Sequence, residues 1–365
     1  MITITNTVTL PFDYSFMDDF HEGYACIVNL RQKLGFLDDT GGLAIPFEYS
    51  AKPVNSKGLP LSVNCVRPTK FMGGMAGVCK DDKCGFIDTK GHIVIPFVYD
   101  DVQNFKDGIA SVKKGEKWGA INQANEIIIP FEYDRHFLFC EGLAAVYKNA
   151  KFGYIDKSGK MILQTEYPFN LSFGNFSEGL AAIKQNDMFG YIDETASVKI
   201  SFELDYDAVG QFQNSFAFVQ KNGKYGIISK EGNLIVPVEY DMVFAPCITA
   251  IKSGSITRFD ANGNKLFSFA ADSMFCYSEG LIGVITDGKY GFLNENGTLA
   301  IVPQYACAMP FCNGYSVAKT GEKWGIINRS GNTVLPFVYD QIGNLSSEKT
   351  VAIKGNKAYI LHLSI

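Results

Sequence analysis

The sequence predicts an all-β protein built from about ten tandem copies of one small antiparallel unit. A motif of the form Lys–aromatic–Gly–apolar–Ile–Asp recurs along the 365 residues, and 34 residues separate two of its glycines, Gly119 and Gly153. Turn residues recur at fixed distances from this motif, and no helical periodicity competes with it. Self-similarity at such a spacing is typical of repeat architectures.

The anchor position of the motif defines ten units. Eight anchors are glycine and two are degenerate, and we place them at Gly35, Gly85, Gly119, Gly153, Gly190, Gly226, Thr257, Gly291, Gly325 and Ala358. We expect a single repeat domain over residues 1–365, with a half-unit at 1–20 and a loop insertion at about 50–74. The degenerate unit at Thr257 is either a worn repeat or a place where the array bends.

Each unit is predicted to be a three-stranded meander followed by a loop. The first strand follows Glu-Gly, as in EGLAAVYK at 141–148, and the second holds the motif, as in KFGYID at 151–156. An Asp-x-x-Gly turn comes next, in which Asp bonds back to the turn amides and Gly takes a positive φ. The third strand is apolar and ends near a Pro and a Tyr, as at Pro130 and Tyr133.

The second strand is apolar on both of its faces, which predicts that the units stack. In the copy at 151–156, Phe152 and Tyr154 point one way, and Gly153 and Ile155 point the other. A sheet with two apolar faces must be covered on both sides, and the neighbouring copy is the available cover. The anchor glycine lets an aromatic ring lie flat against the backbone.

Two arrangements of the stack are open. We favour an open, superhelical, solenoid-like array, because three strands are few for a propeller blade, which usually has four. The alternative is a closed propeller-like ring in which an N-terminal strand completes the last unit. Residues Pro11 and Tyr14 match the third strand of a unit, and the unit at Ala358 lacks one, as that alternative requires.

Composition excludes several classes of protein. The chain is 47% hydrophobic, which excludes disorder, and its net charge of −5 argues against binding to nucleic acid or an anionic membrane. The opening residues lack the basic start and apolar run of a secretory signal, and no apolar run is long enough for a membrane helix. Nine cysteines without a Cys-x-x-Cys pair predict neither a disulfide framework nor a zinc site, so we expect a cytoplasmic protein.

These residues resemble the WG-repeat family, also described as KWG repeats. The segment KWGIINRSGNTVLPFVYDQI follows the family consensus nearly residue for residue, and the resemblance covers essentially the whole chain. Only Trp118 and Trp324 keep the tryptophan of the motif. The family is mostly bacterial, and the resemblance implies a β-repeat scaffold without implying catalytic or cofactor-binding residues.

Two sets of repeated side chains are candidates for a binding surface. Stacked in register, the lysines before the motif would form a row that could meet an acidic partner, although a solvated strand edge explains them as well. The loop tyrosines could form an aromatic shelf, although covering the ends of the sheets is the commoner role. The candidates are Lys83, Lys117, Lys151, Lys224, Lys289, Lys323, Tyr99, Tyr133, Tyr240 and Tyr339.

The function that this pattern favours is a non-enzymatic scaffold that binds a protein partner through variable loop positions. The alternative is a glycan- or small-ligand-binding module with one shallow site per unit. The four histidines lie far apart, and the recurring Asp is explained by the turn, so we expect no metal and no cofactor.

Overall fold

The computed structural model describes residues 2–9, 14–50, 69–165, 175–185, 187–345, 349–355 and 357–363. Most of the insertion predicted at about 50–74 lies outside the described residues. Over the described ranges the chain forms β-strands, turns and one short 3-10 helix. The all-β prediction is therefore confirmed.

The chain divides into two compact units. Unit 1 comprises Met1–Leu138, Cys312–Asn328 and Asn332–Ile365, and unit 2 comprises Phe139–Phe311 and Arg329–Gly331. The strands of unit 1 are β1 (Ile2–Thr9), β2 (Tyr14–His21), β3 (Tyr24–Asn29), β4 (Lys33–Asp38), β5 (Leu43–Ser50), β6 (Met75–Lys80), β7 (Lys83–Asp88), β8 (Ile93–Tyr99), β9 (Asp101–Val102), β10 (Ile109–Lys114), β11 (Lys117–Asn122), β12 (Ile127–Tyr133), β33 (Tyr315–Thr320), β34 (Lys323–Asn328), β35 (Thr333–Tyr339), β36 (Gln341–Ile342), β37 (Lys349–Lys354) and β38 (Lys357–Leu363).

Unit 2 holds the middle of the chain. Its elements are β13 (Phe139–Cys140), β14 (Leu143–Lys148), β15 (Lys151–Asp156), β16 (Met161–Thr165), β17 (Ala181–Gln185), β18 (Met188–Ile192), β19 (Val198–Leu204), β20 (Ala208–Val209), β21 (Phe216–Lys221), β22 (Lys224–Ser229), β23 (Leu234–Tyr240), β24 (Met242–Phe244), η1 (Ala245–Cys247), β25 (Thr249–Lys252), β26 (Ser255–Phe259), β27 (Lys265–Ala270), β28 (Ser273–Ser278), β29 (Leu281–Thr286), β30 (Lys289–Asn294), β31 (Leu299–Tyr305) and β32 (Cys307–Ala308).

The described strands form ten small antiparallel sheets, one for each predicted repeat. Most sheets have four strands rather than the predicted three, because part of the loop before the first predicted strand also pairs. In the sheet β12-β11-β10-β9, Val102 lies opposite Val112 and Asp101 lies opposite Lys113. This fourth strand is only two residues long, so it carries no periodic pattern that the sequence could reveal.

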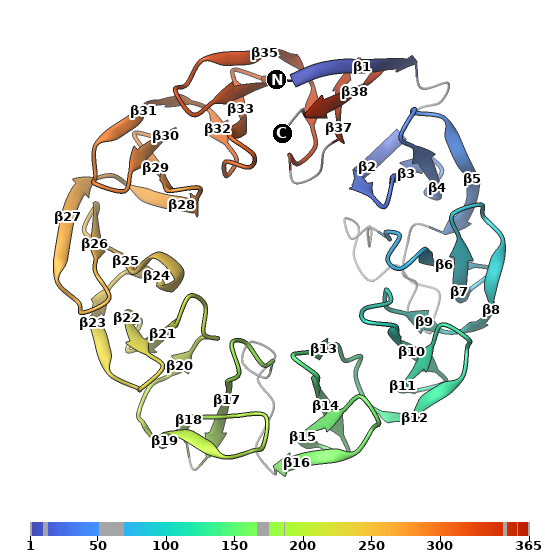
Figure 1. Ribbon diagram of the computed structural model, residues 1–365, viewed down its shortest axis with the longest axis horizontal. Helices are drawn as coiled ribbons and strands as arrows, with labels where there is room; N and C mark the ends of the chain where they lie inside the picture. The colour runs from blue at the N-terminus through green and yellow to red at the C-terminus, as the bar shows by residue number, and fades with distance from the viewer. Residues whose placement is uncertain are drawn as a thin grey trace. The chain divides into compact units, whose positions relative to one another are not determined.

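The N-terminal strand closes the last sheet. Strand β1 pairs antiparallel with β38, from Ile2 opposite Leu363 to Thr9 opposite Lys357, in the order β1-β38-β37-β36 (Figure 1). The open array favoured by the sequence is therefore wrong, because its first and last strands would lie ten repeats apart. The alternative, a closed propeller-like fold completed by the N-terminal strand, is confirmed.

Neighbouring sheets cover one another as the two-faced strands predicted. One core cluster joins Phe86 and Ile95 of one sheet to Phe105, Ala110 and Ile121 of the next, and all five are at most 2% exposed. The rings of Phe86 and Phe105 have centroids 4.6 Å apart in a tilted arrangement. Aromatic contacts of this kind add to the free energy gained from apolar burial.

The anchor glycine has a role that a side chain would block. A Cβ at Gly119 would lie 2.6 Å from the Ile129 carbonyl oxygen and 3.1 Å from the Phe131 ring. The outer strand bulges beside this glycine: Trp118 lies opposite Tyr133, but Ala120 lies opposite Ile129. The predicted contact between an aromatic ring and the glycine backbone is confirmed. The bulge in the outer strand was not predicted from the sequence.

The Asp-x-x-Gly turns also take the predicted form. In the turn after β4, Asp38 Oδ1 accepts hydrogen bonds from the Thr40 and Gly42 amides at 2.9 Å each. The Gly41 amide donates to the Asp38 carbonyl at 3.0 Å, and Gly41 has φ +83°. The Asp38 carboxylate therefore binds amides of its own turn. This is the role in the hairpin that the sequence analysis assigned to the recurring aspartate.

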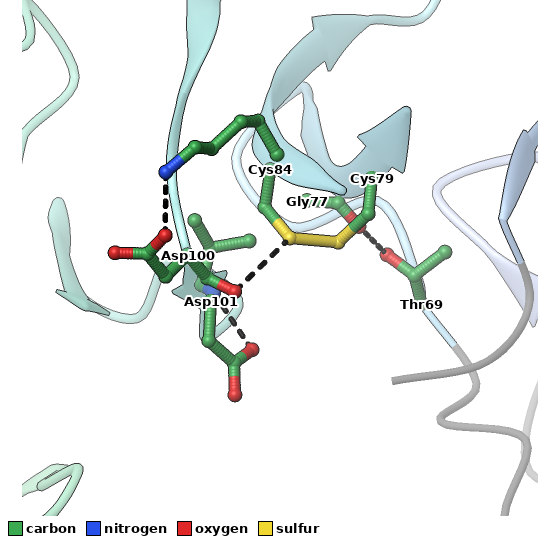
Figure 2. Close-up of a disulfide and its surroundings, with 8 residues drawn as sticks. Thr69, Gly77, Cys79, Cys84, Asp100 and Asp101 are labelled. Carbon is green, nitrogen blue, oxygen red and sulfur yellow. Dashed lines mark hydrogen bonds and ion pairs between the residues drawn. A yellow bond between two sulfur atoms is a disulfide. The ribbon is translucent and has the colours of Figure 1, made fainter. Parts of the chain in front are cut away.

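The expectation of no disulfide is wrong. Cys79 and Cys84 lie directly opposite each other at the end of β6 and β7 and are joined by a disulfide, with their Cα atoms 3.9 Å apart (Figure 2). A two-residue turn, Asp81-Asp82, with φ +51° and +61°, sets this register. The six other cysteines among the described residues are free.

Candidate interaction surfaces

The predicted row of lysines is largely used in ion pairs. Lys83 lies 2.5 Å from Asp100 and Lys224 lies 2.5 Å from Asp241, and equivalent pairs join Lys117 to Asp134 and Lys323 to Asp340. Each aspartate directly follows a predicted loop tyrosine. Lysine and aspartate are 17 residues apart in sequence, so the sequence analysis did not pair them.

The second carboxylate oxygen of these aspartates binds the next hairpin. Asp100 accepts from the Gly115 amide at 2.6 Å, and Asp340 accepts from the Gly355 amide at 2.7 Å. The hydrogen bond from Lys323, followed by that from the Gly355 amide, lowers the pKa of the Asp340 carboxyl. A single side chain therefore ties the end of one sheet to the hairpin of the following sheet.

Two of the six predicted lysines depart from this scheme. Lys289 is exposed and makes no ion pair with a described residue, because Ala306 stands where the four units with a lysine–aspartate pair have aspartate. Lys151 takes part in further contacts, and the residues that follow β16 lie outside the described part of the chain. Binding of an acidic partner by the row stays a prediction.

The four predicted tyrosines lie in the core or at its margin. Tyr99, Tyr133 and Tyr339 are at most 5% exposed, and Tyr240 is half-buried against Phe259 with ring centroids 5.9 Å apart. Burial, followed by the neighbouring Glu132 carboxylate, raises the pKa of Tyr133 to about 12. Their placement matches the covering role, and no shelf of exposed rings forms from these residues.

A set of acidic contacts was missed by the sequence analysis. Glu141 accepts hydrogen bonds from the Glu178 and Gly179 amides, both at 2.7 Å, with one carboxylate oxygen each. Glu22 binds the Gly73 and Gly74 amides in the same way, at 2.7 and 2.9 Å. We call these contacts turn clamps, because each joins the first turn of one sheet to the first turn of the next.

The signal for the turn clamps was the Glu-Gly dipeptide that recurs at one phase of the repeat. Glu178 continues the series by accepting from the Ser215 amide at 3.0 Å, and it also pairs with Lys230 at 3.0 Å. Glu22, Glu141 and Glu178 all have φ near +50°, followed by a glycine with positive φ. Two successive residues of this kind turn their amides outward, which makes a site for a carboxylate.

An exposed apolar position also recurs on the outer strands. Most outer strands have a buried aliphatic residue near the start, such as Ile95 in β8. In most of these strands the residue two positions before it is large and apolar, and its side chain faces solvent. The members are Leu43 (40% exposed), Ile93 (58%), Ile127 (58%), Val198 (53%), Leu234 (50%) and Leu299 (45%). We call this set the outer apolar positions.

The degenerate unit at Thr257 contains a different polar contact. Arg258 replaces an aromatic or aliphatic core residue, is 14% exposed at its side chain, and stacks over Tyr277 with 4.8 Å between guanidinium carbon and ring centroid. Its guanidinium lies 3.6 Å from the Glu295 carboxylate, which also accepts a hydrogen bond from the Tyr277 hydroxyl. These residues join two neighbouring sheets of unit 2.

The described residues hold neither a metal-binding cluster nor a membrane-spanning helix. Within the described ranges, no three side chains of His, Cys, Asp or Glu are arranged to hold a metal ion. The same residues include no helix long and apolar enough to cross a membrane.

The sequence profile of the WG containing repeat matches seven segments, at residues 85–118, 118–152, 152–188, 189–225, 225–246, 290–324 and 324–357. These segments cover more than half of the chain. This chain belongs to the WG-containing repeat family. The family resemblance seen in the sequence is thereby confirmed. The profile does not match the degenerate unit at Thr257.

Solved structures are similar to this chain at low sequence identity. A eukaryotic initiation factor structure is 10% identical, with a TM-score of 0.51, and the match covers 95% of this chain and 98% of that one. The computationally designed Ika8 protein is 10% identical with a TM-score of 0.40, covering 80% of this chain and 95% of that one. BamB from Moraxella catarrhalis is 10% identical with a TM-score of 0.39, covering 72% and 96%. Among curated proteins, none matches this chain.

Proposed function

We propose that this WG-repeat protein is a non-enzymatic scaffold that binds a protein partner. The observation that carries the proposal is the set of outer apolar positions, in which large side chains such as Ile93 and Ile127 are each 58% exposed. Ile93 and Ile127 lie on neighbouring sheets of unit 1, where an apolar surface of a partner could bury both side chains.

The features that recur in most units support the same proposal, because a structural role already accounts for each of them. The anchor glycine, the lysine–aspartate pairs and the turn clamps each have a structural partner, as with Gly119, Lys83 and Glu141. Recognition would therefore use positions that vary between units, which is how repeat proteins distinguish their partners.

Capture of a partner from lysate tests the proposal, with two lysines introduced on neighbouring sheets of unit 1. The variant I93K/I127K should lose the captured protein, because a charged ammonium on each strand opposes burial against an apolar surface. The matched control is T333K, which places lysine at the same position of β35, where the native residue is an exposed threonine. The proposal fails if wild type captures nothing above background, or if I93K/I127K captures as much as T333K does.

Three further expectations from the sequence concern the type of ligand and the location of the protein. Glycan binding was the alternative, and no observation favours it, since Tyr99, Tyr133 and Tyr339 are buried; a glycan array tests it. Nucleic acid and membranes are not expected as partners, given the net charge of −5 and the paired lysines. A cytoplasmic location is opposed by the Cys79–Cys84 disulfide, because disulfides persist in oxidising compartments.

A further inference from the structure

Strand β27, like β16, differs from seven other outer strands of the repeat. Seven outer strands carry the bulge opposite the anchor, namely β5, β8, β12, β19, β23, β31 and β35. Six of these also contain proline close to the bulge, at Pro46, Pro96, Pro130, Pro237, Pro303 and Pro336. Bulges and prolines on an edge strand prevent another strand from pairing with it.

Strand β27 contains no proline and no bulge opposite the anchor position, and its one register shift lies between Arg258 and Phe259. It pairs with β26 in one register from Ser255 opposite Ala270 to Arg258 opposite Phe267. Thr257 replaces the anchor glycine, and its hydroxyl lies 2.8 Å from the hydroxyl of Ser268. The anchor position of this unit therefore carries a side chain, and the outer strand runs past it without a register shift.

The register fixes which backbone groups of β27 face outward. The Ala271 amide donates to the Gly254 carbonyl at 3.1 Å, so residues 267 and 269 also turn their backbone groups toward β26. The amides and carbonyls of Ser268 and Ala270 therefore face away from the sheet. Strand β27 is the edge of the sheet β24-β25-β26-β27, as Figure 1 shows, and no other described residue bonds to these two amides.

The free edge is accessible to a second chain. The side chain of Leu266 is 56% exposed, and Ser268 and Ala270 are exposed as well. Phe267 and Phe269 are half-buried against the core that the sheet shares with the next one. The edge therefore offers unpaired donors and acceptors on a strand that the rest of unit 2 holds in place.

We propose that β27 pairs antiparallel with β27 of a second copy of this chain. The sequence Leu266-Phe267-Ser268-Phe269-Ala270 is nearly palindromic, so an antiparallel copy centred on Ser268 presents the same pattern. Ser268 then forms a hydrogen-bonded pair with Ser268 of the second copy, and Leu266 pairs with Ala270. Phe267 lies opposite Phe269 on the other face, and aromatic pairs across strands stabilise such sheets.

This arrangement joins two four-stranded sheets into one sheet of eight strands. It is isologous, because the same residues contribute from both copies about a two-fold axis, and it therefore stops at a dimer. A single pair of strands buries less surface than a standard protein interface, so the dimer should dissociate on dilution.

Sedimentation velocity over a concentration series tests the proposal. Wild type should shift from monomer to dimer as concentration rises, and S268P should weaken the dimer by about tenfold or more, because each copy loses an outward amide. S268A is the matched control: it also loses the hydroxyl contact with Thr257 but keeps the amide, and it should dimerise like wild type. A wild type that stays monomeric, or an S268P dimer as stable as wild type, overturns the proposal.

Hydrogen exchange on wild type covers the case in which S268P does not fold. Exchange of the segment that contains Ser268 and Ala270 should slow as the concentration rises. Unchanged exchange in a sample that dimerises overturns the proposal, because the dimer then uses another surface. A wild type that stays monomeric but binds a synthetic peptide of residues 264–272 also overturns it, in favour of a foreign strand.

Discussion

At the scale of single residues, the repeat depends on positions where only one side chain fits. Gly119 is such a position, because the Ile129 carbonyl and the Phe131 ring occupy the space that a Cβ would need. The residues around it can yield only by moving backbone, which is costly in a packed interior. The recurrence of glycine at eight anchors follows from this contact.

The substitution G119A should lower the free energy of unfolding by about 2–3 kcal/mol, as expected for overpacking in a core. Urea denaturation measures the change. The matched control is T257A at the anchor of the degenerate unit, which removes a methyl group and a hydroxyl from a position that already accepts a side chain, and it should cost less. An equal cost for the two variants would contradict the role assigned to the glycine.

The lysine–aspartate pairs give a graded prediction. K323A should cost a few tenths of a kcal/mol, since the pair is exposed to solvent. D340A should cost more, because the Gly355 amide also loses its acceptor. K289A, which removes a lysine without an aspartate partner, should leave the urea midpoint unchanged, and a cost equal to that of K323A would count against the pairing.

The same aspartate predicts a pH dependence. The pKa of Asp340 is lower in the folded protein than its ordinary value, because Lys323 and the Gly355 amide stabilise the charged form. Its contribution is therefore fully present above the unfolded pKa of about 3.9 and is lost as the pH falls through the folded value. The difference in stability between wild type and D340N should disappear in acid, as measured by thermal unfolding at pH 7 and pH 2.

At the scale of elements, neighbouring sheets are held by contacts between turns as well as by their apolar faces. The Glu141 carboxylate meets two amides of the next turn, and the Asp100 carboxylate meets the next hairpin. Both contacts use backbone donors, so they fix the position of one sheet against the next independently of side-chain packing in the core.

The variant E141Q should lower the free energy of unfolding by about 1 kcal/mol. In glutamine an NH₂ group replaces one of the two carboxylate oxygens, so one of the two backbone N–H groups of the next turn faces a donor in place of an acceptor. E116Q is the control, since Glu116 is an exposed residue of the β10–β11 hairpin. Hydrogen exchange should also speed up at the Glu178-Gly179 turn in E141Q and not in E116Q. Unchanged exchange at this turn would show that the turn clamp does not hold it.

The disulfide at the β6–β7 hairpin should have a limited effect on stability. Cys79 and Cys84 close a loop with a sequence separation of 5, and the chain-entropy cost of so small a loop corresponds to about 2 kcal/mol. The double variant C79S/C84S should therefore unfold at a lower temperature by a few degrees and keep its β circular dichroism spectrum. Reduction of wild type should reproduce this shift, and loss of all cooperative unfolding would contradict it.

At the scale of the whole molecule, the sequence reveals what repeats and conceals what occurs once. The anchor glycines, the Asp38 type of turn and the two-faced strands follow from local patterns that recur in most of the ten units. The pairing of β1 with β38 joins residues from the two ends of the chain, and the sequence indicates it only by a third-strand pattern near Tyr14 and by the missing third strand of the unit at Ala358. The Asp100–Gly115 contact and the turn clamps connect different sheets, so the sequence shows their residues but not their partners.

The number of strands in each sheet explains why the open array was favoured. Counting three strands per unit favoured an open array, whereas pairing by short segments such as β9 supplies the fourth strand of a propeller blade. The core residues were predictable because burial follows the alternation of side chains along a strand. The closure was predicted only as the alternative, because it depends on one pair of strands.

Cross-linking of the first strand to the last tests that closure most directly. In the variant T9C/K357C the two new cysteines lie opposite each other in the β1–β38 register, and Lys357 is exposed, so mild oxidation should join them within one chain. Mass spectrometry of the digested monomer should then detect a peptide pair that links positions 9 and 357. A folded monomer in which this pair never forms would contradict the closed fold.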